Sequence, residues 1–146
     1  MLAATLFKRL KRTLVTRLAD KANTEKPRRL CNNGRVSPLL AKAAGLLGIR
    51  LVGKASDEGT LEPLEKCRGE QRALSSIVAT MKKLGTTDGK VKIGHCQNEN
   101  AANKLKELIL SELKGADVEI YQSRGLCSFY AEKGGLMIGF EKQGVK

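Results

Sequence analysis

The sequence is poor in aromatic residues, lacks tryptophan and contains a single histidine. Aromatic residues make up 3% of the 146 residues, so the core must be built almost entirely from aliphatic side chains. The same scarcity argues against the aromatic platforms with which many modules bind nucleic acids. A Ser–His–Asp triad would have to use His95, and neither a nucleophile elbow nor a Walker-type phosphate loop is present. We therefore expect no catalytic site and no enzyme activity.

The four cysteines do not form the close pairs typical of metal sites. Cys31, Cys67, Cys96 and Cys127 lie about thirty residues apart, whereas zinc ligands usually occur in short spacings. His95 and Cys96 are neighbours, but an expected strand there would point them to opposite faces. The pattern is typical of reduced thiols in a cytoplasmic protein without a metal or other cofactor. No apolar run is long enough to predict a transmembrane segment.

The positive charge is concentrated at the N-terminal end. The formal net charge is +12, and residues 1–29 contain nine basic residues against Asp20 and Glu25, which gives +7. The remaining residues carry +5, an ordinary value for a soluble domain. A basic arm can bind phosphate backbones or anionic membranes without specificity. Because no recognisable reading module accompanies it, we expect no specific nucleic-acid binding.

Leucines recur every four residues from Met1 to Ala22 and predict a basic amphipathic helix: Leu2, Leu6, Leu10, Leu14 and Leu18. Three interpretations remain open, namely a targeting or membrane-surface helix, a helix packed on the domain, or a segment foreign to the fold. Residues 23–27 form a polar linker. We therefore assign residues 1–27 to a basic helical arm and linker outside the fold, and residues 28–146 to the folded domain.

Helical and strand patterns alternate along the rest of the chain and predict an α/β fold with a mixed sheet flanked by helices. Strands are expected at 49–55 and 60–66, joined as a hairpin, and Pro63 marks the second as an edge strand. Helices are expected over 69–84 and from Asn98 or Asn100 to about Leu113. The remaining strands are expected at 91–95, 117–121 and 135–141.

A tight turn, an arginine and an apolar helix follow one another after residue 30. Asn33 and Gly34 are strong turn residues, and Ser37 with Pro38 is typical of the start of a helix. The expected helix over 39–47 is apolar nearly all round, which indicates burial. An arginine held between a tight turn and a buried helix is well placed to bind an anion or a carboxylate, so Arg35 is the first candidate binding residue.

This region resembles the second domain of the DegV family, bacterial proteins that bind fatty acids. The resemblance continues through Lys66-Cys67-Arg68-Gly69 and the stretch 125–140, and covers roughly residues 30–141. It depends on the order and spacing of several motifs. The family has two domains with the ligand between them, so the resemblance implies that this chain is a second-domain fragment.

The resemblance implies a chain that holds a long-chain fatty acid and presents its carboxyl group to a separate fatty acid kinase subunit. The implied ligand-binding residues are Arg35, Val36, Ser128 and Tyr130. Tyr130 stands where the family has a histidine that contacts the carboxyl group. It can donate a hydrogen bond but cannot act as a cation near neutral pH. Arg68 is implied as a surface for an acidic partner, and the missing first domain implies an exposed apolar face and self-association.

A second interpretation comes from the residues without the resemblance. The chain would be a small basic interaction module that binds nucleic acid or an anionic membrane through its N-terminal arm. Arg68 would then be a solvated charge, Tyr130 a half-buried packing residue, and His95 a structural histidine. Salt-dependent binding that disappears on deletion of the arm distinguishes this interpretation from lipid binding.

Overall fold

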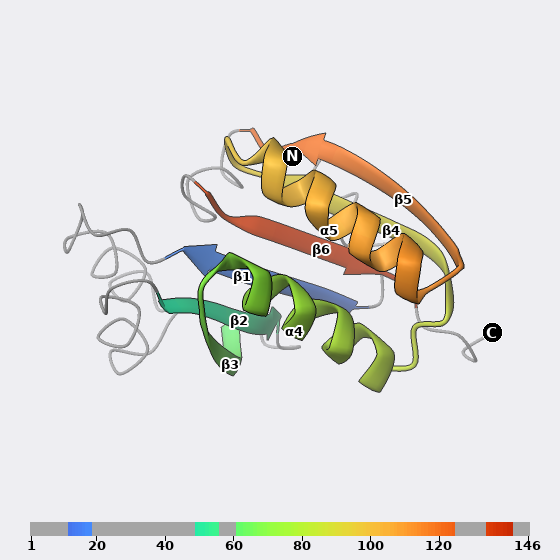
Figure 1. Ribbon diagram of the computed structural model, residues 1–146, viewed down its shortest axis with the longest axis horizontal. Coiled ribbons are helices and arrows are strands. Elements are labelled where there is room, and N and C mark those ends of the chain that lie inside the picture. Colours follow the sequence, from blue (N-terminus) through green and yellow to red (C-terminus); the bar gives the residue numbers. More distant parts are fainter. Residues whose placement is uncertain (1–11, 19–48, 56–60, 125–133, 142–146) are drawn as a thin grey trace.

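The computed structural model describes residues 12–18, 49–55, 61–124 and 134–141. They form a six-stranded sheet with both helices on one face (Figure 1). In chain order the elements are β1 (Arg12–Leu18), β2 (Ile49–Ala55), β3 (Leu61–Arg68), α4 (Glu70–Lys83), β4 (Asp88–His95), α5 (Glu99–Glu112), β5 (Gly115–Gln122) and β6 (Leu136–Phe140).

The sheet is mixed, as the sequence predicts. Its strand order is β3-β2-β1-β6-β4-β5. β4 and β5 are parallel and are connected through α5, while the other neighbouring pairs are antiparallel. α4 lies over the half of the sheet that contains β1 and β2, and α5 lies over the half that contains β4 (Figure 1). The predicted α/β class is confirmed.

β1 corrects the prediction for the N-terminal arm. Residues 12–18 form a strand inside the sheet, antiparallel to both β2 and β6, and not a helix outside the fold. Thr13, Val15 and Thr16 are β-branched and favour a strand. β2 and β6 also offer backbone groups on both sides that need partners. The hydrogen bonds to β2 and β6 therefore outweigh the helical tendency that the four-residue leucine spacing indicates. Because β1 belongs to the sheet, the folded unit includes residues before the predicted boundary at residue 28. The other residues of the arm lie outside the described ranges.

The β2–β3 hairpin ends the sheet at one side, which confirms the predicted edge strand. The register shifts between Val52 and Gly53: Val52 pairs with Glu65 and Gly53 pairs with Pro63. Leu64 is therefore bulged out of the ladder, and it is one of the exposed large hydrophobic residues. A proline and a bulge both make an edge strand a poor template for further pairing.

The two helices begin and end at residues with recognisable terminal signals. Gly69 precedes α4 with φ 84°, and α4 ends where the Thr86 amide donates to the Met81 carbonyl, with Gly85 at φ 85°. Asn98 caps α5 because its side chain accepts a hydrogen bond from the Ala101 amide. Both predicted helices are confirmed to within about two residues.

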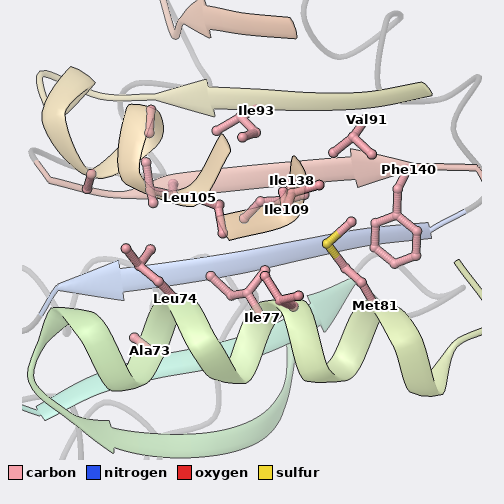
Figure 2. Packing of buried hydrophobic residues seen from close by; sticks show 14 of the residues in the cluster. Ala73, Leu74, Ile77, Met81, Val91, Ile93, Leu105, Ile109, Ile138 and Phe140 are labelled. Atoms are coloured by element: carbon pink, nitrogen blue, oxygen red, sulfur yellow. The ribbon is translucent and has the colours of Figure 1, made fainter. Parts of the chain in front are cut away.

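The core lies between the helices and one face of the sheet (Figure 2). Val91, Ile93 and Ile138 of the sheet are fully buried, and α4 and α5 contribute alanine, leucine, isoleucine and methionine side chains. Phe140 is the one aromatic residue among the buried hydrophobic residues of the described ranges. Full burial of each large side chain stabilises the fold by about 1.5–3 kcal/mol. The core is aliphatic, as the composition predicts.

Two further predictions fall outside the described residues. The apolar helix expected over 39–47 is one, and with it the exposed apolar face on which the expected self-association depends. Within the described residues, no helix combines the length and apolar character needed to cross a bilayer.

Candidate functional site

The predicted ligand-binding residues belong to two chain segments that leave and re-enter the sheet at one end. Arg35 and Val36 lie in 19–48, and Ser128 and Tyr130 lie in 125–133; both segments are outside the described residues. The flanking strands are described, and their registers place these entry and exit points. We call this end of the sheet the His95 end.

The His95 end is defined by the paired residues at the strand termini. Leu18 at the end of β1 pairs with Arg50, next to the start of β2. Leu136 at the start of β6 pairs with Thr16 of β1 and with His95 at the end of β4. In Figure 1 it is the left-hand end, toward which the arrowheads of β1 and β5 point. Both candidate segments therefore connect to the same end of the sheet.

The carboxyl ends of the parallel strands also lie at the His95 end. His95 pairs with Gln122, the last residue of β5, and α5 begins four residues after His95. The His95 end of the sheet is therefore where β4 and β5 end and where α5 begins.

Arg68 is the one predicted site residue that the structure describes. It is the last residue of β3, it is exposed, and it pairs with Ile49 at the start of β2. Arg68 therefore lies at the His95 end on the edge strand, beside the point where the segment carrying Arg35 enters the sheet. An exposed arginine at a sheet edge is accessible to an acidic surface of another molecule.

An ion-pair network on the helix-covered face was not found from the sequence. Arg50 Nη2 lies 3.0 Å from Glu70 Oε2, and Lys104 Nζ lies 3.3 Å from Glu70 Oε1. These contacts connect β2, α4 and α5. Burial lowers the pKa of Arg50 from its ordinary value, while the charge and hydrogen bond of Glu70 raise it. The feature of the sequence that could have indicated this network is Glu70, which lies in the first turn of a predicted helix, where a carboxylate is favoured.

The described residues include two buried cysteines, Cys67 and Cys96. Burial raises the pKa of the Cys67 thiol, with a hydrogen bond to Ser76 acting in the opposite direction. A neutral thiol is a poor nucleophile. Among the described residues, no three His, Cys, Asp or Glu side chains are grouped so that they could hold a metal ion.

Comparison with known proteins identifies the family. The family model described as "Uncharacterised protein, DegV family" matches residues 24–143. A DegV domain-containing protein of Streptococcus pyogenes serotype M3 is 47% identical over 112 residues, which make up 77% of this chain and 40% of that protein. A related protein of Streptococcus pneumoniae strain R6 is 43% identical over the same length. The chain belongs to the DegV family, which confirms the resemblance.

Two solved structures are similar to this chain in both sequence and fold. A DegV family protein from Eubacterium eligens, loaded with heptadecanoic acid, superposes with a TM-score of 0.81 at 36% identity, covering 97% of this chain and 49% of that one. The fatty acid kinase B3 protein of Streptococcus pneumoniae, loaded with linoleic acid, gives a TM-score of 0.79 at 38% identity, covering 96% and 47%. This chain spans about half the length of the relatives that it matches.

Proposed function

We propose that this chain is a fatty-acid-binding protein, or a portion of one, that presents the carboxyl group of a bound acyl chain to a separate fatty acid kinase. The supporting observation is that both segments with predicted ligand residues connect to the His95 end of the sheet. Two similar structures were solved with long-chain fatty acids bound. The apolar acyl chain needs a nonpolar environment, whereas the charged head group needs hydrogen-bond donors. Different parts of the protein would supply these two environments.

The head group is assigned to Arg35, Val36, Ser128 and Tyr130. Arg35 supplies a permanent charge and a forked set of donors, which match the two oxygens of a carboxylate. Ser128 and Tyr130 each supply a hydroxyl that can donate one hydrogen bond. The proposed site binds the carboxylate and performs no reaction on it.

The acyl chain supplies most of the affinity. Removing roughly fifteen methylene groups from water is favourable by about 0.8 kcal/mol each before the costs of association are counted. This gross gain is sufficient for binding without any covalent bond. The proposed role is therefore that of a carrier, and the chemistry on the carboxyl group belongs to the kinase.

Arg68 is the proposed contact with the kinase. Its exposure at the β3 edge and its place at the His95 end would bring an acidic partner surface close to the presented head group. Charged groups at the rim of an interface mainly increase the rate and specificity of association. Arg68→Ala should therefore weaken kinase association and leave fatty-acid affinity unchanged.

Titration calorimetry with a soluble medium-chain fatty acid tests the head-group assignment. Arg35→Ala should weaken binding by about 1.5–3 kcal/mol, the scale of a charged hydrogen bond, and Tyr130→Phe by about 0.5–1.5 kcal/mol. Tyr130→His should preserve or improve binding. Arg72→Ala is the matched control, because Arg72 is an exposed arginine on α4. Unchanged affinity combined with a sharply lower melting temperature in Arg35→Ala would make Arg35 a structural residue and overturn the assignment.

A further inference from the structure

The two edges of the sheet are built differently. The β3 edge contains Pro63 and the bulge at Leu64, which make it a poor template for another strand. β5, at the other edge, pairs with β4 in an unbroken parallel register from Gly115 to Gln122 (Figure 1). Within the described ranges, no strand pairs with the outer side of β5. β5 is therefore the edge at which the sheet can be extended.

The outer side of β5 carries a row of backbone donors and acceptors. The Ser123 amide donates to the His95 carbonyl, so the backbone groups of Ser123 point toward β4. The direction of these groups alternates from residue to residue along a strand. The amide and carbonyl groups of Val118, Ile120 and Gln122 therefore point away from β4, toward the open side of the edge.

Exposed apolar side chains border the same edge. Of the three exposed large hydrophobic residues of the described ranges, Tyr121 lies on β5, Leu110 on α5 and Leu64 on β3. Lys104 and Glu112 of α5 form ion pairs with α4. Leu110 lies roughly 120–160° round the helix from both of them, on the side away from α4. Since α5 also contacts β5, two of the three residues flank the β5 edge.

The charges of β5 exclude several ways in which a second copy could pair with it. Two copies related by a two-fold axis would pair antiparallel, and residues directly opposite each other would share a face of the sheet. A register centred on Asp117 or on Glu119 places two identical carboxylates opposite each other. A register centred on Val118 places Asp117 opposite Glu119. Like charges directly opposite each other destabilise a strand pair.

A register centred on Ile120 avoids these repulsions. It places Ile120 opposite itself beside the partly buried hydrophobic residues of the helix-covered face. On the polar face it places the Glu119 carboxylate opposite the Tyr121 hydroxyl, which can donate to it. The outward backbone groups of Val118 would pair with those of Gln122. A register centred on Tyr121 would pair only residues 120–122 within β5, so it would form fewer hydrogen bonds.

We propose that the β5 edge is a self-association surface, at which two copies of this chain pair antiparallel about Ile120 to form one continuous sheet. The two-fold axis is perpendicular to the sheet, so the helices of both copies cover the same face. The two α5 helices then lie side by side across the axis. This inference goes beyond the proposed function and does not depend on it.

Gln122→Pro tests the pairing, with Gln122→Ala as the matched control. Gln122 is exposed and its amide points away from β4, so proline removes an outward donor without removing a bond to β4. Alanine removes the same side chain and keeps the amide. Sedimentation velocity over a range of concentrations should show a monomer–dimer equilibrium for the wild type and for Gln122→Ala. Gln122→Pro should raise the dissociation constant of the dimer about tenfold or more, because the symmetry of the pair removes two hydrogen bonds.

Cross-linking tests the register. In the proposed dimer the two Ile120 residues form a hydrogen-bonded pair, whose Cα atoms are about 5.5 Å apart and within reach of a disulfide. Ile120→Cys should therefore give a covalent dimer under mild oxidation. Gln122→Cys should not exceed the level of the wild type, which measures the background from the native cysteines.

Each outcome supports or overturns the proposal. A wild type that stays monomeric at every concentration overturns it, and so does a dimer that is equally strong in Gln122→Pro and Gln122→Ala. Assemblies that grow beyond two copies also overturn it, because a two-fold pair is closed. If Gln122→Pro does not fold, cross-linking decides: Ile120→Cys must exceed both the wild type and Gln122→Cys. None of these measurements depends on whether the chain binds fatty acid.

Discussion

The two faces of the sheet differ in what covers them and in what their side chains do. On the face under the helices, Val91 and Ile93 of β4 and Ile138 of β6 are completely buried. On the opposite face of the β4–β5 pair, Lys92 lies beside Glu119 and Tyr121 of the neighbouring strand. Because side chains alternate along a strand, residues next to each other in sequence serve these two different faces.

The polar face carries a small cross-strand cluster. Lys92 Nζ lies 3.3 Å from Tyr121 Oη and 5.3 Å from the centre of its ring. The Tyr121 hydroxyl donates to Glu119, and Lys92 Nζ lies 3.4 Å from that carboxylate. Exposed contacts of this kind contribute little to stability, because water competes for the same groups. The apolar face should therefore hold the fold together, while the polar face adds only minor stability.

Exchanging an aromatic residue on each face gives the largest expected effect. Phe140→Ala should reduce the free energy of unfolding by about 3–5 kcal/mol, because it leaves a cavity under the helices. Tyr121→Ala, at a residue that is 36% exposed, should cost only about 0.5–1 kcal/mol. Urea unfolding of both variants measures the difference. Equal losses would show that the polar face contributes as much as the core.

Two ion pairs formed by residues of β2, one with α4 and one with β3, provide the next comparison. The Arg50 and Glu70 side chains are 12% and 28% exposed, whereas those of Lys54 and Glu62 are 37% and 49% exposed. Arg50→Met should lower the free energy of unfolding by about 1–3 kcal/mol, since it removes a charged partner from a partly buried carboxylate. Lys54→Met should change it by less than about 1 kcal/mol. A larger loss of unfolding free energy in Lys54→Met than in Arg50→Met would contradict the expectation that the less exposed ion pair contributes more to stability.

The smallest expected effect is a change in titration on the polar face. The Tyr121 hydrogen bond is the main cause that lowers the pKa of Glu119, and Lys92 acts in the same direction. A lowered pKa stabilises the fold above the ordinary range of glutamate, and this contribution is lost as the pH falls through the folded pKa. Tyr121→Phe should therefore raise the pKa of Glu119 toward its ordinary value. An NMR titration of the Glu119 carboxyl group that shows no change would contradict this.

Titration at alkaline pH tests the other two members of the same cluster, Lys92 and Tyr121. The hydrogen bond to Glu119 is the main cause that raises the pKa of Tyr121, and the hydrogen bond to Tyr121 is the main cause that raises that of Lys92. Both groups favour their protonated forms in the folded state. Their contributions are complete below the ordinary pKa values, near 10, and are lost as the pH rises through the folded values.

Local signals explain how much of the fold was predictable. Leu74, Ile77 and Met81 recur at helical spacing and Gly85 ends the pattern, which predicted α4. Asn98 or Asn100 was the predicted cap of the second helix, and in the structure Asn98 caps α5. Pro63 identified the edge strand. β1 could not be predicted in the same way, because its pattern becomes a strand only when β2 and β6 lie on either side of it. Such partners are distant in sequence, and no local spacing reveals them.

The candidate site shows the same limit. The ligand residues were predicted from short motifs, namely the turn before Arg35 and the motifs that resemble the family. The hydrogen bond from the Asn98 side chain to the Gly134 carbonyl, by contrast, joins residues that are 36 positions apart. The capping signal at Asn98 was visible in the sequence, but its second partner was not. A residue with one recognised local role can therefore make a second contact that only the fold reveals.

Native mass spectrometry of the full chain with heptadecanoic acid tests whether the chain binds a fatty acid. We expect a one-to-one complex whose mass exceeds that of the protein by one fatty acid, and a smaller bound fraction for Arg35→Ala than for Arg72→Ala. Circular dichroism on the same samples confirms that the chain is folded. A folded chain that shows no fatty-acid adduct at any concentration would contradict the proposed function.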